Sequence, residues 1–413
     1  MRILIVNSVA LNVGDAAILQ GEIRALREVF GEGVRIDVSE QTPTVAARLY
    51  PEIAFHAGLH VQHAHWPRWR SHGGMASVRK RRTRLAVRLL ATAPAAARAL
   101  LSAEQRAHLD LMAAADIVVA TGGTYFVEHY DFTAKADELL AAQALGKPTF
   151  LFTQSMGPFT KAKSQLTMQR IVAGSRGVFV RDEKSKRHLA EAHAAMAHVN
   201  VHADAAFALA TPDVPRTQRS GRPRVAISVR RWSHFRAGSG EDVGERYRRA
   251  VADAARALVR DGAEVTFLST CQGVPEYWTD DSKFATQLVA DLLPGEPHIH
   301  VDTAFRSPTA LAEALRGFDV AIATRMHFAI LALCVATPVV AIAYEFKSRE
   351  LLTAMGHAAW AFDIEDVSAD GLVRATREAL GGGNPLRASI AEQVRVYRTD
   401  AVGPAKRIQA ALR

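Results

Sequence analysis

Residues 318–344 read FDVAIATRMHFAILALCVATPVVAIAY. Two apolar runs of strand length, 319–324 and 338–344, flank an apolar run of helix length at 327–335. Arg325 and His327 interrupt the pattern near its middle. If the first strand persists, the two side chains share a face, and if the helix has already begun, His327 lies within its first turn.

Arg325 is the harder of the two residues to explain structurally. A histidine among apolar residues is usually a core residue with satisfied hydrogen bonds. A buried guanidinium, however, cannot be neutralised by a pKa shift and must face an anion. We therefore predict that Arg325 faces an anionic ligand and that His327 is functional as well.

The alternation of short apolar runs and amphipathic helix patterns extends outward through the whole chain, which predicts parallel sheets covered by helices on both faces. The pattern breaks once, at the Pro-, Arg-, Ser- and Gly-rich residues 211–224. We predict an α/β fold of two doubly wound Rossmann-like domains facing a cleft. The expected boundaries are 1–212 and 222–385, with helices over 386–413 that pack back across the junction.

The composition is that of a soluble globular protein, with 413 residues, 23% of them charged and 49% hydrophobic. The N-terminus lacks the pattern of a signal peptide, and no segment approaches a membrane span. Two cysteines, Cys271 and Cys334, are too few for a disulfide framework or a cysteine metal site. We expect a cytoplasmic protein.

The net charge of +9 comes from one segment. Residues 53–103 contain no Asp or Glu but nine basic residues, and the rest of the chain is balanced. Within residues 66–88, Trp66, Trp69, Leu85 and Val87 alternate with arginines, which is typical of a segment that contacts an anionic membrane surface rather than nucleic acid. A solvated basic loop and helix explains the same pattern equally well. The basic insert spans about 56–100.

Ligands of doubly wound sheets bind beyond the carboxyl ends of the strands, so the residues that follow each strand are candidates. In the N-terminal half they can either form turns and helix caps, as we expect for Asp15 before a helix beginning at Ala16, or hold sugar hydroxyls. Neither a P-loop nor a GxGxxG motif is present. These candidates are Asn12, Gly14, Asp15, Gly122, Gly123, Gln154 and Ser155.

Arginines follow two other strand patterns. Asp182 is predicted to cap a helix, which leaves Arg181 as a candidate anion contact. Arg230 and Arg231 are consecutive after a strand and point opposite ways, so at most one of them faces the cleft.

Several of these segments, in this order, resemble the polysaccharide pyruvyl transferase family. They are NVGDAAIL, ATGGTYF, QSMGPF, VRDEKS, HADAAFAL, AISVRR, TRMHFAILAL and TPVVAIAYEFKSRELL, and the resemblance spans residues 1 to about 356. It implies a two-domain architecture of the GT-B type. Members of this family transfer the enolpyruvyl group of phosphoenolpyruvate to two hydroxyls of a sugar, which forms a cyclic ketal and releases phosphate.

The resemblance implies roles for the candidate residues. His327 matches the catalytic histidine and Arg325 the arginine that holds the donor, with Arg230 or Arg231 as a second donor cation and Arg181 as a further candidate. The N-terminal candidates would hold the acceptor, a polysaccharide, oligosaccharide or lipid-linked glycan. We expect no metal and no cofactor beyond phosphoenolpyruvate, no nucleic acid partner, and peripheral contact with the inner face of the membrane.

Two other interpretations remain. A nucleotide-sugar glycosyltransferase of the same architecture would use an acidic residue such as Glu345 or Glu350 to bind a ribose. A non-catalytic protein would bind an anionic polymer or a membrane through residues 66–88, and Arg325 and His327 would then have no function.

Overall fold

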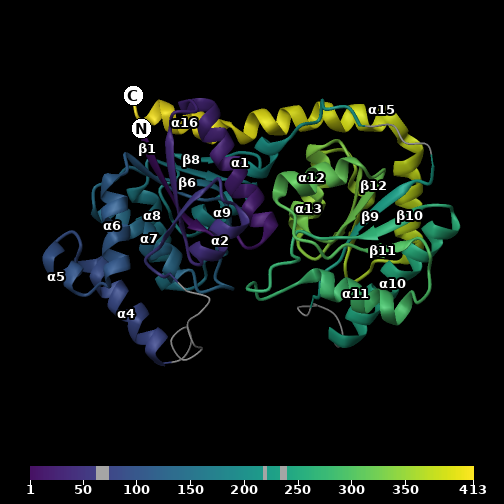
Figure 1. Cartoon of the computed structure of the whole chain (residues 1–413). Coiled ribbons are helices and arrows are strands. Elements are labelled where there is room, and N and C mark those ends of the chain that lie inside the picture. Colours follow the sequence, from purple (N-terminus) through teal and green to yellow (C-terminus); the bar gives the residue numbers. More distant parts are fainter. Residues whose placement is uncertain (62–73, 217–220, 233–239) are drawn as a thin grey trace. The chain divides into compact units, whose positions relative to one another are not determined.

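The computed structural model describes residues 1–61, 74–216, 221–232 and 240–413. The chain forms two compact units. Unit 1 comprises residues 1–11, 18–208 and 399–413, and unit 2 comprises residues 12–17 and 209–398. Figure 1 shows a sheet with helices packed around it in each unit, coloured along the sequence.

Unit 1 is built on a parallel sheet with the strand order β3-β2-β1-β4-β6-β7-β8, and β5 pairs with β6. Its central strands are apolar and fully buried because helices cover both faces. The strands are β1 (Arg2–Ser8), β2 (Arg35–Glu40), β3 (Ala54–Ala57), β4 (Ile117–Ala120), β5 (Gly123–Phe126), β6 (Thr149–Met156), β7 (Gly177–Val180) and β8 (Val199–Val201).

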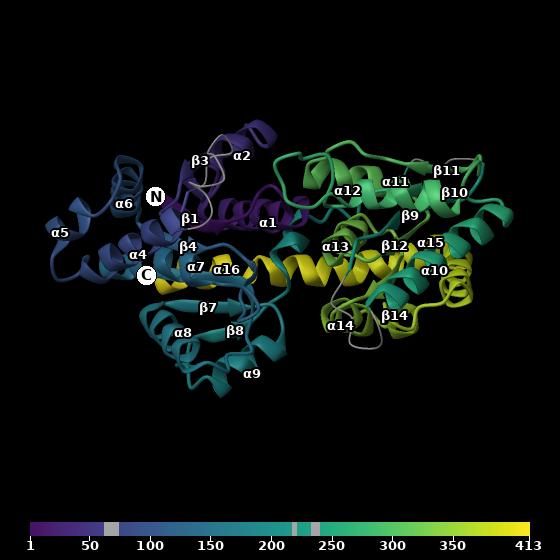
Figure 2. The same cartoon turned by 90° about the horizontal axis from the view of Figure 1, so that it is seen from below.

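The described helices of unit 1 pack apolar faces onto this sheet and onto one another. In Figures 1 and 2, α4, α5 and α6 form a projection at one end of the unit. The helices are α1 (Val13–Phe30), α2 (Pro43–Leu49), α4 (Gly74–Leu89), α5 (Pro94–Ala99), α6 (Ala103–Ala114), α7 (Thr133–Ala144), α8 (Ala162–Gly174), α9 (Glu183–Glu191), the 3-10 helix η1 (Ala205–Leu209) and α16 (Gly403–Ala411).

Unit 2 has a parallel sheet with the strand order β11-β10-β9-β12-β13-β14. This is the order of a doubly wound nucleotide-binding fold, in which the chain runs outward in one direction, returns to the centre and runs outward in the other. The strands are β9 (Arg224–Ser228), β10 (Glu264–Phe267), β11 (Ile299–Val301), β12 (Val320–Ala323), β13 (Val339–Ala343) and β14 (Ala361–Asp363).

The helices of unit 2 connect these parallel strands through right-handed crossovers. α10 and α11 contact each other, and α13 contacts both α12 and α14. Residues 328–334 of α13 are all buried, which explains the uninterrupted apolar sequence after His327. The helices are α10 (Gly240–Arg260), α11 (Asp281–Leu292), α12 (Pro308–Arg316), α13 (Met326–Cys334), α14 (Phe346–Ala354), the 3-10 helix η2 (Ala358–Trp360) and α15 (Ala369–Ala401).

The structure corrects one detail of the sequence-based prediction. α1 begins at Val13 rather than Ala16, and Asn12 rather than Asp15 precedes it, with Asn12 Oδ1 accepting a hydrogen bond from Gly14 N at 2.9 Å. The segment after β8 is the 3-10 helix η1. Asp182 caps α9 as predicted, because its side chain accepts a hydrogen bond from Ser185 N.

Residues 62–73, including Trp66 and Trp69 of the predicted membrane-contacting segment, lie outside the described residues. The basic residues from Arg79 onward lie on and after α4. No helix within the described part of the chain is long and apolar enough to cross a membrane.

Candidate active site

The candidate site lies at the carboxyl edge of the unit 2 sheet, where the strand order changes direction. β9 and β12 pair side by side, although β10 and β11 separate them in sequence. Ligands of doubly wound sheets bind beyond the strand ends at such a switch point. Arg230 follows β9 and Arg325 follows β12, so two of the predicted donor-binding arginines lie at the ends of adjacent strands.

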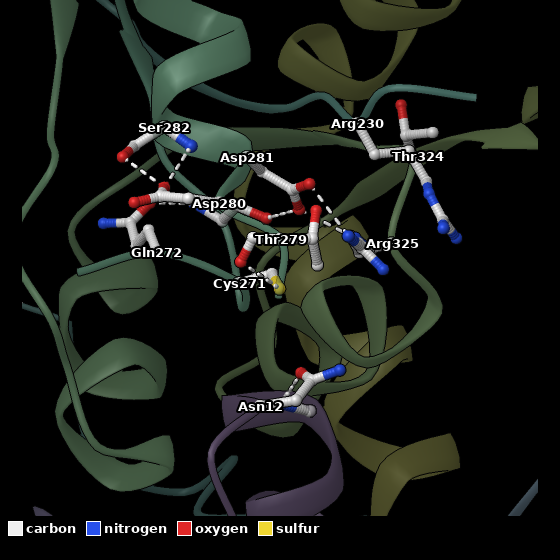
Figure 3. A network of polar contacts seen from close by, with 12 residues as sticks. Asn12, Arg230, Cys271, Gln272, Thr279, Asp280, Asp281, Ser282, Thr324 and Arg325 are labelled. Carbon is white, nitrogen blue, oxygen red and sulfur yellow. Dashed lines mark hydrogen bonds and ion pairs between the residues drawn. The ribbon is translucent and has the colours of Figure 1, made fainter. Parts of the chain in front are cut away.

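Arg325 forms a two-pronged ion pair with Asp281 (Figure 3). Its Nε and Nη2 donate to the two carboxylate oxygens at 2.7 and 2.8 Å. Only 12% of the Arg325 side chain and 2% of the Asp281 side chain are exposed. Burial acts to lower the pKa of Arg325, but Asp281 outweighs it and raises that pKa above its ordinary value. The anion that the sequence required beside Arg325 is therefore supplied by the chain itself.

Asp281 is itself held in place, which makes Arg325 a rigid group. It is the first residue of α11, its backbone N–H donates to Cys271 O at 2.7 Å, and its Oδ2 also accepts from Ser269 Oγ at 2.7 Å. In Figure 3 one terminal nitrogen of Arg325 faces Asp281 and the other points away from it. A guanidinium can donate through several nitrogens, so the pairing leaves donor capacity for a ligand.

Arg230 lies against two aromatic rings that contact each other, with their centres 4.6 Å apart. Its guanidinium carbon is 4.9 Å from the ring centre of Trp232 and 4.4 Å from that of Tyr344, which follows β13. The Nε of Arg230 is buried and has no hydrogen-bond partner among the described residues. These cation–π contacts hold the guanidinium without using its N–H groups.

Arg231 has a different environment from Arg230. It is exposed, and its guanidinium carbon lies 5.9 Å from the ring of Phe284 on α11. The two consecutive arginines therefore have separate surroundings, with Arg230 beside the strand ends and Arg231 at the surface. Which of them binds a donor remains a prediction, and the geometry favours Arg230.

Tyr247 of α10 links the ends of β9 and β12. Its hydroxyl accepts a hydrogen bond from Arg230 N at 3.3 Å and lies 3.0 Å from Thr324 Oγ1. Burial raises the pKa of Tyr247 to about 12, so the phenol remains protonated near neutral pH. The hydroxyl thus acts as a fixed bridge between the two strand ends that carry the arginines.

His327 lies in the first turn of α13, so of the two arrangements considered for it the helical one is correct. The imidazole is partly exposed and packs against Gly14. A Cβ at Gly14 would lie 3.0 Å from both Cβ and Nδ1 of His327, so a larger residue there would displace the ring. Gly14 therefore leaves room for the histidine.

Three of the predicted acceptor-binding residues, Asn12, Gly14 and Asp15, belong to unit 2 together with His327 and Arg325. Their segment is tied to the loop after β10 by a hydrogen bond of 3.0 Å from Val13 N to Thr270 O. Figure 3 shows Asn12 near the network around Arg325. The first turn of α1 is thus part of the same site, although it lies far from His327 in sequence.

Cys271 is the one cysteine in this network. Its thiol donates to Thr279 O at 3.6 Å, and burial raises its pKa to about 12. Because the thiolate is the nucleophilic form, Cys271 is a poor nucleophile near neutral pH. The thiol is therefore not a candidate for acid–base chemistry near neutral pH, and the role of His327 stays a prediction.

Arg181 in unit 1 is enclosed by side chains of its own unit. It donates from Nε to Ser155 Oγ and from Nη2 to Thr124 Oγ1, both at 2.7 Å, and its Nη1 pairs with Asp204. Only 5% of its side chain is exposed. These contacts give Arg181 and Ser155 a structural role, and their predicted binding of donor and acceptor remains untested.

The remaining unit 1 candidates lie around the ends of β4 and β6. Gln154 is fully buried, its amide nitrogen donates to Thr121 O, and its Oε1 has no partner among the described residues. A Cβ at Gly122 would approach Thr153 Oγ1 to 2.7 Å, and Gly123 has a φ of 140°. Close packing and backbone conformation therefore account for both glycines, and their predicted contact with acceptor remains a prediction.

Sequence reasoning missed Asp281, Tyr247, Trp232 and Tyr344. Trp232 and Tyr344 could have been found from the sequence, because both closely follow strands whose ends were already considered as binding positions. Asp281 and Tyr247 could not have been found in this way. Asp281 contacts Arg325, which is 44 positions away, and Tyr247 contacts Thr324, which is 77 positions away. Among the described residues, no group of three or more His, Cys, Asp or Glu side chains is arranged to hold a metal ion.

The geometry, two arginines and a histidine at the carboxyl edge of a doubly wound sheet, can be compared with known proteins. The sequence model of the polysaccharide pyruvyl transferase family matches residues 12–345. A curated relative, the amylovoran biosynthesis protein AmsJ of Erwinia amylovora, is 25% identical over 409 residues, which cover 96% of each chain. The chain belongs to the polysaccharide pyruvyl transferase family, whose members are transferases of polysaccharide biosynthesis.

Solved structures with the same fold are more distant in sequence. The UDP-GlcNAc 2-epimerase of Neisseria meningitidis superposes with a TM-score of 0.60 at 12% identity, covering 100% of this chain and 99% of that one. A putative UDP-N-acetylglucosamine 2-epimerase of Listeria monocytogenes gives 0.61 at 15% identity, covering 100% and 95%. These similarities confirm the predicted fold class, two Rossmann-like domains of the GT-B type.

Proposed function

We propose that this protein transfers the enolpyruvyl group of phosphoenolpyruvate to a sugar of a glycan, forming a pyruvate ketal and releasing phosphate. The observation that carries the proposal is the placement of Arg230, Arg325 and His327 together at the switch point of unit 2, in a chain that belongs to the pyruvyl transferase family. Phosphoenolpyruvate carries a carboxylate and a phosphate, and arginine is the side chain best suited to both.

The two arginines would bind this donor in different ways. Arg325 is fixed by Asp281 and offers the guanidinium nitrogen that points away from it. Arg230 is held by the two aromatic rings, and these cation–π contacts leave its guanidinium N–H groups for a ligand oxygen. Both groups are therefore oriented before the donor arrives, which reduces the entropic cost of binding.

His327 would act as the general acid. It donates a proton to the methylene carbon of phosphoenolpyruvate, the central carbon becomes electrophilic, and a sugar hydroxyl adds to it. Loss of phosphate and attack by a second hydroxyl then close the ketal, and one hydroxyl proton returns to the histidine while the other leaves with phosphate. An imidazole is suited to this exchange because its ordinary pKa is close to neutral.

The acceptor would be a polysaccharide, an oligosaccharide or a lipid-linked glycan. We propose that the neutral hydrogen-bonding groups at the strand ends of unit 1, with Asn12 and Asp15, take part in binding it. No cofactor other than the co-substrate phosphoenolpyruvate is included in this scheme. The reaction would take place in the cytoplasm, where phosphoenolpyruvate is available.

Peripheral contact with an anionic membrane would use one face of α4. Val78 and Leu85 are 65% and 48% exposed and lie seven residues apart, hence on the same side of the helix. Arg81, Arg82 and Arg88 are exposed around them, while Ala86 and Val87 pack into the core. We call Val78, Leu85 and these three cations the α4 face. Exposed apolar groups among cations are typical of interfacial helices.

The test of the proposed reaction is phosphate release by the purified protein from phosphoenolpyruvate, measured with a panel of glycan acceptors. The expected result is acceptor-dependent release together with a mass increase of about 70 Da in the glycan, which is the mass of pyruvic acid less one water. A parallel reaction contains UDP-glucose in place of phosphoenolpyruvate. Transfer from UDP-glucose without any use of phosphoenolpyruvate would overturn the proposal and favour the glycosyltransferase interpretation.

A further inference from the structure

A cavity of about 700 Å³ lies in unit 2 at the amino-terminal edge of its sheet. Arg224, the first residue of β9, lines it, as do Asp319, which precedes β12, and Ala336, which precedes β13. The candidate active site lies at the carboxyl ends of the same strands. The cavity is therefore a separate space, and none of its lining residues belongs to the donor site.

The cavity is formed by two segments that pack against this edge of the sheet. One is the chain around Pro212–Arg216 and Gly221–Arg224, and the other is α15 between Leu380 and Arg395. α15 is interrupted here, because Gly383 has a φ of 49° and a ψ of −140°, outside the helical range, and Pro385 follows it. The interruption turns the helix so that residues on both sides of Gly383 line the cavity.

The lining carries an excess of positive charge. Five arginines line the cavity but only two acidic residues, Asp213 and Asp319. Both acidic residues are already paired, Asp213 with Arg395 at 2.6 Å and Asp319 with Arg216 at 2.5 Å. Three arginine charges are therefore not matched by a carboxylate of the lining, and the five arginines are Arg216, Arg222, Arg224, Arg387 and Arg395.

Arg387 shows the cost of this excess. Its guanidinium donates to backbone carbonyls, to Ala336 O at 3.2 Å, to Asp319 O at 3.3 Å and to Phe318 O. Burial and the neighbouring Arg216 and Arg316 lower its pKa to about 10, against the smaller opposing effect of Asp319. The charged form of Arg387 is thus destabilised by burial and by the neighbouring arginines, and an anion in the cavity would stabilise it.

Arg216 and Arg395 are two of the cations that a ligand could reach. Their side chains are 24% and 47% exposed. The Nε of Arg216 is buried and has no hydrogen-bond partner among the described residues, although its two terminal nitrogens donate to Asp319 and to Gly317 O. A buried donor without a partner is costly.

We propose that this cavity binds a small organic anion that carries a phosphate group, at a site distinct from the candidate active site. Arginine side chains match the oxygens of a phosphate in geometry as well as in charge. The volume exceeds that of a phosphate ion and lies in the range of small-molecule sites, about 300–1,000 Å³. The small apolar side chains of Val335, Ala388 and Ala391 provide a surface for the organic part.

The test is calorimetric titration with glucose 1-phosphate as the probe, with orthophosphate and glucose as separate arms. Wild-type protein is expected to bind glucose 1-phosphate, and the double variant Arg216→Gln/Arg395→Gln is expected to lose at least about tenfold in affinity. The double variant could fail to fold, so the single variant Arg395→Gln, which changes an exposed side chain, is tested as well. Its affinity for glucose 1-phosphate is expected to fall about threefold or more.

Two control variants locate the binding. Arg377→Gln removes another exposed arginine of α15, which pairs with Asp261 at 2.8 and 2.9 Å but does not line the cavity. Arg230→Gln removes a cation of the donor site. Both controls are expected to bind the probe with wild-type affinity. Because the double variant leaves the donor site intact, pyruvyl transfer and binding in this cavity can succeed or fail separately.

Three results would overturn the proposal. The first is no binding of glucose 1-phosphate at millimolar concentration. The second is a loss of affinity that appears in Arg377→Gln or Arg230→Gln as strongly as in the double variant. The third is orthophosphate binding as tightly as glucose 1-phosphate, because the organic part of the ligand would then contribute nothing.

Discussion

Arg181 in unit 1 and Arg325 in unit 2 follow similar apolar strands, yet their surroundings differ. Arg181 uses Nε, Nη1 and Nη2 for Ser155, Asp204 and Thr124. Arg325 uses Nε and Nη2 for one residue, Asp281, and lies next to the turn that carries His327. The side chains are 5% and 12% exposed.

The difference shows that a buried arginine at a strand end is not by itself a sign of ligand binding. A guanidinium has five N–H donors, and its role depends on how many of them the protein already uses. In unit 1 three nitrogens serve to hold loops together, whereas in unit 2 the carboxylate orients one edge of the guanidinium. We expect substitutions in unit 1 to affect mainly stability and substitutions in unit 2 to affect mainly donor binding.

The largest effect on stability is expected for Arg181→Gln. The change leaves the Asp204 carboxylate, which is 6% exposed, without its ion-pair partner. Removing one member of a buried pair typically costs about 4 kcal/mol of unfolding free energy. Denaturant unfolding measures this, with the exposed Arg231→Gln as a control that should change stability by less than about 0.5 kcal/mol. Equal effects of the two variants would contradict the structural role of Arg181.

Glu22 of α1 offers a second test of the buried polar groups in unit 1. Its side chain is fully buried, and burial raises its pKa to about 8 from 4.5. Below pH 4.5 the Glu22 carboxyl is protonated in both the folded and the unfolded chain. Between pH 4.5 and 8 the unfolded chain releases this proton and the folded chain retains it, so stability falls as the pH rises.

The variant Glu22→Gln should remove this dependence. Between pH 6 and 8 we expect the wild type to lose about 2 kcal/mol more unfolding free energy than the variant. Denaturant unfolding at the two pH values provides the comparison, in which the other titrating groups cancel. If both proteins show the same change, Glu22 does not hold a proton in the folded state.

In unit 2 the prediction concerns donor affinity. Arg230→Gln should raise KM for phosphoenolpyruvate by about tenfold or more with a small change in stability, because it removes a charge-assisted contact with the donor. Arg230→Lys should not restore KM, since an ammonium cannot reproduce the planar guanidinium that lies against Trp232 and Tyr344. An unchanged KM in both variants would remove Arg230 from the donor site.

The smallest effect is expected for the α4 face, which lies outside both strand-end networks. Sedimentation with phosphatidylglycerol vesicles should show binding that weakens as salt is raised. Val78→Ser/Leu85→Ser should reduce it about threefold to tenfold. Val396→Ser on α15 is the matched control, because Val78 and Val396 are both 65% exposed. Binding that is insensitive to salt and to both changes would exclude this surface.

The sequence predicted the fold class because each strand and helix carries its own hydrophobic period. β12, α13 and β13 could be located from residues 318–344 alone. The positions of Arg230, Arg325 and His327 at strand ends followed from the same pattern. Their partners could not be predicted, since the contact between Arg325 and Asp281 depends on how α11 is placed against the end of β12.

The role of Gly14 was also beyond the sequence. A glycine at position 14 suggested a tight turn or a sugar contact, but the structure shows that Gly14 makes room for the His327 ring. The membership of residues 12–17 in unit 2 likewise depends on tertiary packing, in particular on the bond from Val13 N to Thr270 O. A local pattern defines an element, whereas the neighbours of that element depend on the whole chain.

The measurement that tests the central claim most directly is a comparison of phosphoenolpyruvate binding and turnover in His327→Asn. The amide keeps a polar group in the first turn of α13 but cannot donate the proton. We predict that turnover falls at least about 100-fold while calorimetric affinity for phosphoenolpyruvate stays within about threefold of the wild type. Turnover at the wild-type rate in this variant would contradict the assignment of His327 as the general acid.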